Sequence, residues 1–103
     1  MAEQSHPWRT DEMKDLFEAI LALENPDEVE RFLRDLCTLS ELGAMAHRWE
    51  VVKLVEQGLS YQEISSRTGA STTTVTRVAH WLRYGEGGYR LALERRKRLS
   101  PTP

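Results

Sequence analysis

The chain has 103 residues, 40% hydrophobic and 29% charged, which is the composition of a folded globular protein and enough for one domain. Its one cysteine, Cys37, excludes an intrachain disulfide and a thiolate metal site, and its place on an apolar stripe predicts a packing role. The N-terminus lacks the pattern of a signal peptide. No apolar stretch reaches the ~18 residues that a membrane span needs. We therefore expect a cytoplasmic protein that makes no membrane contact.

The net charge of −2 conceals a strong asymmetry along the chain. Residues 1–47 hold four lysines and arginines against eleven aspartates and glutamates, a net charge of −7. Residues 48–103 hold ten against five, a net charge of +5. Such a division favours one surface for a polyanion and another surface for a different partner.

Helix signals recur along the first half, and strand signals are absent. The first helix is expected after Thr10, and Asn25-Pro26 ends it and caps the second. Thr38 with Glu41 forms a capping box for a long third helix that ends at Gly58. Apolar residues recur at helical spacing in the first two helices: Met13, Leu16, Phe17, Ile20, Leu21, Val29, Phe32, Leu33, Leu36 and Cys37. These positions predict one buried face on each helix.

The third helix is apolar on more than one side. Leu42, Met45, Trp49 and Val52 form one stripe, and Ala44, Val51, Leu54 and Val55 form another. A helix that is apolar over so wide an arc is packed by several neighbours. A chain of this length offers too little covering, so we expect a homodimer.

The second half predicts two short helices and a basic last helix. Ser60 and Glu63 resemble a further capping box, Gly69 ends that helix, and Ser71 or Thr72 caps the next. The predicted single domain, 1–103, contains dimerisation helices at 9–58, a helix-turn-helix at 59–84, a last helix at 89–99 and a disordered tail at 100–103.

Residues 59–82 fit a helix-turn-helix, with Ile64, Val75 and Val78 as inward anchors and a glycine in the turn. Small Ser65 is expected to let the two helices approach. Hydroxyl-rich residues then surround the outward N-terminal end of the second helix, which is the part that meets base edges in the major groove. The candidate residues for double-stranded DNA are Gln62, Arg67, Ser71, Thr72, Thr73, Thr74, Thr76 and Arg77. We expect Thr72, Thr73 and Thr74 at the bases, and Arg67 and the last helix at phosphates or the dimer surface.

Thr38 through Leu82 resembles the tryptophan repressor family. The matching residues are Thr38, Arg48, Gly58, Ser60, Glu63-Ile64, Gly69-Ala70 and Thr74 to Arg77. The resemblance implies an all-α fold of about six helices and an interwoven homodimer. It also implies two recognition helices on a palindromic operator, and a repressor as the type of regulator.

The resemblance further implies a ligand site, from which this sequence departs. In the family's repressor, tryptophan lies between two arginines, matched here by Arg48 and Arg77, and contacts a residue matched by Thr38. Val78 replaces a glycine that leaves room for the ligand, and Trp81 replaces a serine that contacts it. We expect the Trp81 indole to occupy the ligand's space between the guanidinium groups, or to pack on the third helix with the pocket lost. Both alternatives predict that tryptophan is not a corepressor. We also expect no cofactor.

Catalysis is not expected, because His6, His47 and His80 form no metal-spaced cluster and no glycine-rich phosphate loop follows a strand. Two alternatives stay open. Beside the DNA-binding regulator that we expect, these are a helical dimeric protein-interaction module and a ligand-responsive repressor.

Overall fold

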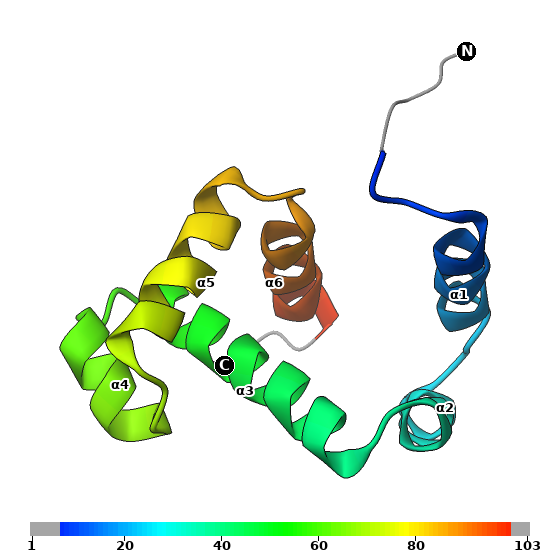
Figure 1. Ribbon diagram of the computed structural model, residues 1–103, viewed down its shortest axis with the longest axis horizontal. Helices are drawn as coiled ribbons and strands as arrows, with labels where there is room; N and C mark the ends of the chain where they lie inside the picture. The colour runs from blue at the N-terminus through cyan, green and yellow to red at the C-terminus, as the bar shows by residue number, and fades with distance from the viewer. Residues whose placement is uncertain (1–6, 100–103) are drawn as a thin grey trace. The chain divides into compact units, whose positions relative to one another are not determined.

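The computed structural model describes residues 7–99, which form six helices and no strand (Figure 1). The predicted all-α class is confirmed. The helices are α1 (Asp11–Leu21), α2 (Pro26–Leu36), α3 (Leu39–Glu56), α4 (Tyr61–Thr68), α5 (Thr72–Tyr84) and α6 (Gly88–Leu99). The last helix begins one residue earlier than predicted. The expected disordered tail at 100–103 lies outside the described residues, as does His6.

The helix starts follow the predicted caps. The Thr10 hydroxyl accepts a hydrogen bond from the Met13 backbone N–H at 3.1 Å. At the start of α3 the box is reciprocal, since Thr38 Oγ1 accepts from the Glu41 N–H at 3.0 Å and Glu41 Oε1 accepts from the Thr38 N–H at 2.9 Å. These local bonds satisfy backbone donors that have no partner inside a helix.

The capping box predicted at α4 is only half formed. Ser60 Oγ accepts from the Glu63 N–H at 3.1 Å, as expected. The Glu63 carboxylate does not return to Ser60, and instead forms an ion pair with Arg67 at 3.2 Å. Arg67 lies one turn further along the same helix face and therefore competes for the carboxylate.

The chain divides into two compact units, residues 1–42 and residues 43–103, which we call the N-terminal unit and the C-terminal unit. The described part of the N-terminal unit contains no buried residue. Met13, Phe17 and Ile20 on α1 are 40%, 45% and 41% exposed. The prediction of buried faces on the first two helices is therefore wrong for a single chain, because two short helices cannot cover each other's apolar stripes.

The C-terminal unit has its own core, which joins four helices and the turn after α4. Its buried members are Val51, Val52, Leu54, Ile64, Ala70, Val75, Val78, Leu82 and Leu93. The third helix contributes only from its C-terminal half, whereas Met45 nearer its start is 37% exposed. The expectation of a third helix packed on several sides thus holds for half of its length.

The end of α3 directs the chain into α4. Gly58 has a φ of +90°, and its N–H donates to the Val55 carbonyl at 3.0 Å. The Leu59 N–H donates back to the Leu54 carbonyl at 3.4 Å. This is the Schellman arrangement, which favours glycine at the left-handed position and confirms Gly58 as the predicted end of the helix.

Candidate nucleic-acid interface

The turn between α4 and α5 consists of residues 69–71 and is held by side-chain hydroxyls. Gly69 has the predicted left-handed backbone, with a φ of +81°. Ser65 Oγ donates to the Ala70 carbonyl at 2.6 Å. Thr68 Oγ1 donates to the Ile64 carbonyl at 2.8 Å and accepts from the Ala70 N–H at 3.1 Å. Ser65 is therefore a hydrogen-bond donor that closes the turn, in addition to the small spacer that its sequence position indicated.

The two helices are fixed against each other by the core beneath them. Ile64 on α4 and Val75 and Val78 on α5 are each fully buried, as predicted. A short helix, a three-residue turn and a second helix anchored in this way form a helix-turn-helix. The outward side of α5 is left uncovered in the chain.

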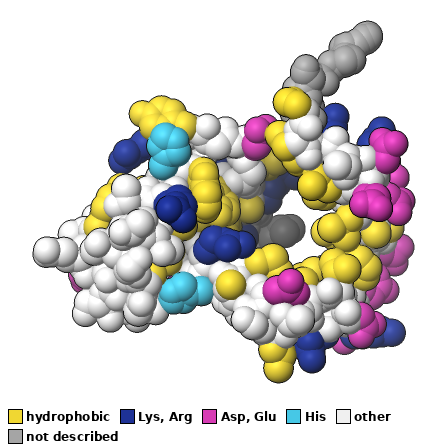
Figure 2. Space-filling view, in the orientation of Figure 1, with side chains coloured by type: hydrophobic (Ala, Val, Ile, Leu, Met, Phe, Trp, Pro, Cys, Tyr) yellow, Lys and Arg dark blue, Asp and Glu magenta, His cyan; other side chains and the backbone are white. Residues whose placement is uncertain are grey.

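The N-terminal end of α5 presents hydroxyl groups of two kinds. Ser71 Oγ accepts from the Thr74 N–H at 3.1 Å and donates to Thr74 Oγ1 at 3.1 Å, so these two side chains bind each other. Thr72, Thr73 and Thr76 are exposed, and their hydroxyls bond to no other group within residues 7–99. Figure 2 shows that the surface over α4 and the start of α5 is mainly uncharged. This end of the domain can therefore offer free hydroxyls to a ligand.

One face of α5 extends this polar surface toward the end of the helix. Thr73, Thr76, Arg77 and His80 line one shallow depression. The His80 ring lies 5.0 Å from the Tyr84 ring at 51°. Sequence patterns did not single out His80 for this face, although its spacing from Thr73 and Thr76 places it on the same helical stripe.

The remaining DNA candidates lie on α4. Gln62 is exposed in its first turn, and Arg67 is exposed in its last turn, where it forms the ion pair with Glu63. Among the described residues, no group of three or more metal-ligating side chains comes together. None of the helices in residues 7–99 combines the length and hydrophobicity of a membrane span.

The structure brings together most of the predicted ligand-site residues. Arg48 on α3 and Arg77 on α5 line a groove of about 250 Å³, whose other lining residues are Ala44, His47, Thr74, Val78 and Trp81. His47 was not predicted here, although it precedes Arg48 by one residue. Thr38 belongs to the N-terminal unit, where it caps α3. Trp81 is 43% exposed and, within the described residues, makes no cation–π contact with either guanidinium group.

Comparison with known proteins agrees with this geometry. Residues 11–97 match the family model of the Trp repressor protein. YerC of Bacillus subtilis (strain 168), which is uncharacterised, is 43% identical over 89 residues, 86% of each chain. A TrpR-like protein from Eubacterium eligens ATCC 27750 has 39% identity and a TM-score of 0.79, covering 86% of this chain and 92% of its own. A putative Trp repressor from Staphylococcus aureus has 38% identity and a TM-score of 0.79, covering 91% and 94%.

The match to the family model extends over nearly the whole helical part of the chain and includes the helix-turn-helix. They confirm the resemblance that Thr38 through Leu82 indicated. The family is one of DNA-binding regulators and not of enzymes. The chain belongs to the Trp repressor family.

Proposed function

We propose that the protein is a sequence-specific transcriptional regulator that binds an operator in double-stranded DNA through α4, the turn and α5. The observation that carries this proposal is the exposed N-terminal end of α5, where hydroxyls without protein partners project from a helix anchored by fully buried side chains. Rigid support below and free polar groups above are what base recognition in a major groove requires.

Within this proposal the exposed threonines recognise bases. Their hydroxyls can bond to base edges, and their methyl groups can contact thymine methyls. We assign base contacts to Thr72 and Thr73, as expected from the sequence. Thr76 and Arg77 would add further DNA contacts along α5. Thr74 is half-buried and bonded to Ser71, so its contribution would be to hold the end of the helix as well as to contact DNA. Gln62 and Arg67 would bind DNA from α4.

The proposed functional unit is a homodimer on an inverted repeat. Its support is the exposed apolar face of the N-terminal unit, together with membership in the family. Two-fold symmetry would place the two recognition helices about 34 Å apart, one turn of the duplex. Light scattering that shows a folded monomer at micromolar concentration would exclude this assembly.

The direct test of DNA recognition is selection of bound sequences from a random DNA pool. We expect one enriched inverted repeat, whose affinity falls steeply as salt rises because phosphates are contacted. Arg67→Ala should weaken binding to all sequences and flatten the salt slope by roughly one unit. A protein-interaction module would enrich no sequence and would be retained weakly by bulk DNA.

Two variants at one position separate the proposed contacts. Thr73→Val keeps a methyl group and loses the hydroxyl, whereas Thr73→Ser does the reverse. If Thr73 recognises a base, one of the two should change the preferred base, by about 1–3 kcal/mol at the affected pair. Identical selected sequences for both variants and the parent protein would remove Thr73 from the recognition surface.

We also propose that L-tryptophan does not control the protein. Trp81 forms part of the wall of the Arg48–Arg77 groove, and fully buried Val78 stands where the family's repressor has glycine. Calorimetry should show no micromolar binding of L-tryptophan. Trp81→Ser combined with Val78→Gly should lose DNA affinity if the indole holds the helix-turn-helix in place. If indole compounds then restore that affinity, the groove is an occluded ligand site.

A further inference from the structure

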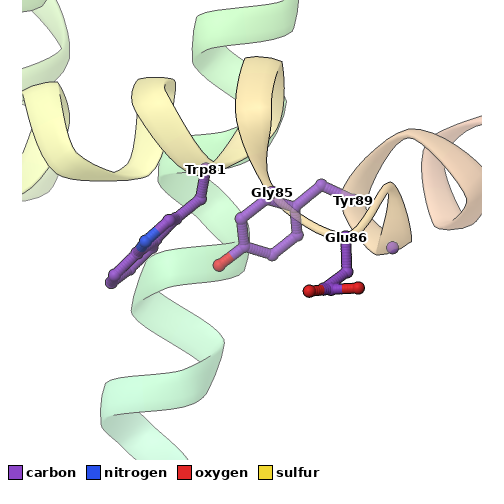
Figure 3. A pocket seen from close by; sticks show the side chains of 5 residues that line it. Trp81, Gly85, Glu86 and Tyr89 are labelled. Carbon is purple, nitrogen blue, oxygen red and sulfur yellow. The ribbon is translucent and has the colours of Figure 1, made fainter. Parts of the chain in front are cut away.

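A second cavity lies where α5 passes into α6, and two aromatic side chains and one carboxylate line it. Its volume is about 570 Å³, and it is lined by Trp81, Gly85, Glu86, Gly88 and Tyr89 (Figure 3). Of these five residues, Trp81 is the only one that also lines the Arg48–Arg77 groove. The two spaces are therefore separate and share Trp81 as a wall. We call the second space the α5–α6 pocket.

Two aromatic rings define the pocket. Figure 3 shows the Trp81 indole extending from α5 and the Tyr89 ring pointing from α6 toward it. The Tyr89 ring also contacts Trp49 on α3, with the two ring centroids 6.4 Å apart. The Trp81 indole is 43% exposed in the single chain.

One acidic side chain lines the pocket. Within residues 7–99, Glu86 is the only charged residue that lines the pocket, and no ion pair formed there includes it. The pocket lies between the C-terminal end of α5, where backbone carbonyls carry partial negative charge, and the first residues of α6, where free N–H groups carry partial positive charge. The two helix ends therefore give the pocket no net sign, and its charge comes from Glu86. A Cβ at Gly85 would lie only 2.5 Å from the Trp81 carbonyl oxygen, so the backbone approaches closely here. The nearby cations Arg83 and Arg90 do not line the pocket.

We infer that the α5–α6 pocket binds an organic cation of the alkylammonium class. The faces of tryptophan and tyrosine attract such cations through their quadrupoles, and a carboxylate beside them adds charge complementarity. A neutral apolar ligand would gain nothing from Glu86. This inference does not depend on DNA binding and therefore stands apart from the proposed function.

The test uses choline as the probe and 3,3-dimethylbutan-1-ol as its neutral isostere. Both are titrated into the ¹⁵N-labelled full chain without DNA, with sodium chloride matching the ionic strength. The indole N–H resonance of Trp81 is assigned with Trp81→Phe. We expect this resonance to shift saturably with choline at millimolar concentration, and the isostere to bind about tenfold more weakly.

Two carboxylate variants provide the specific comparison. Glu86→Gln should weaken choline binding by at least about threefold, since it removes the charge and keeps the shape. Glu94→Gln, an exposed position on α6 that does not line the pocket, should leave binding unchanged. Equal binding of the neutral isostere, an unchanged affinity in Glu86→Gln, or no saturable shift with choline would each overturn the inference.

Discussion

The N-terminal and C-terminal units are built from the same kind of amphipathic helix, with opposite results. The apolar side chains of α1 and α2 are exposed or half-buried, whereas Ile64 of α4 and Val75 and Val78 of α5 are fully buried in a core with α3 and α6. The difference lies in the number of neighbours, because the C-terminal unit has four helices around one core. An apolar stripe thus shows which face needs covering, and the same chain does not always provide the cover.

The two units also differ in the charge of their surfaces. Figure 2 shows acidic side chains gathered over α1 and α2, while the uncharged hydroxyl surface lies over α4 and the start of α5. Acidic side chains repel DNA phosphates, so the N-terminal unit is suited to a protein surface. Four pairs of substitutions follow from these differences, beginning with the largest expected effect.

Ile64→Ala should be the most damaging, because Ile64 is fully buried within the chain's own core. We expect the free energy of unfolding to fall by about 2–5 kcal/mol, measured by urea denaturation. Ser66→Ala, at an exposed position two residues later, should change it by less than about 0.5 kcal/mol. A loss below about 1 kcal/mol for Ile64→Ala would show that the C-terminal core is much looser than described.

Phe17→Ala should act on association. Phe17 contacts Trp8 edge-on at 6.4 Å but remains 45% exposed in one chain. If a second chain covers this face, the substitution removes about 1.5–3 kcal/mol of favourable burial free energy for each Phe17 side chain. The dimer dissociation constant from sedimentation equilibrium should then rise at least about tenfold. Asp15→Ala on the opposite face of α1 is the control, and equal effects of the two variants would place the interface elsewhere.

The substitutions Gly69→Ala and Gly43→Ala should change the stability of the protein in opposite directions. Gly69 has a φ of +81°, so alanine there costs about 1–2 kcal/mol of stability. Gly43 lies inside α3 with open space around it, and alanine should stabilise the helix by about 0.5–1 kcal/mol. Thermal unfolding measures both. Destabilisation by Gly43→Ala would reveal that a second chain packs closely on this part of α3.

The smallest expected changes in stability come from replacing the two glutamates of the predicted capping boxes, Glu41 and Glu63. Glu41 accepts the Thr38 N–H, so Glu41→Ala should cost about 0.5–1.5 kcal/mol. Glu63 makes only an exposed ion pair with Arg67, so Glu63→Ala should cost less than about 0.5 kcal/mol. Chemical denaturation of both variants gives the difference. A larger loss at Glu63 would mean that the half-formed box closes in solution.

Local chemistry explains which features were predictable. Thr10, Thr38 and Ser71 cap helices because a hydroxyl beside a helix start has one favourable acceptor role. Gly69 was predictable because few residues other than glycine adopt its backbone conformation at low cost. The anchors Ile64 and Val75 were predictable from helical periodicity.

Features that depend on distant or competing partners were not predictable. Ser65 and Thr68 close the turn, but a hydroxyl near a helix end has several backbone acceptors in reach. Glu63 had two possible partners, and its choice of Arg67 depends on geometry. The periodicity of α1 did not indicate that its apolar face stays exposed in one chain, because covering is a property of tertiary structure.

The shared wall formed by Trp81 has a consequence for regulation. One indole lines both the groove with two arginines and the pocket with Glu86, and it can occupy only one rotamer at a time. An occupant that shifts the rotamer from one side alters the shape of the other space. Thermodynamic linkage makes such an effect reciprocal, so each occupant would change the other's affinity by the same factor. Substitution of Trp81 therefore alters both spaces at once, and neither can be remodelled independently through this residue.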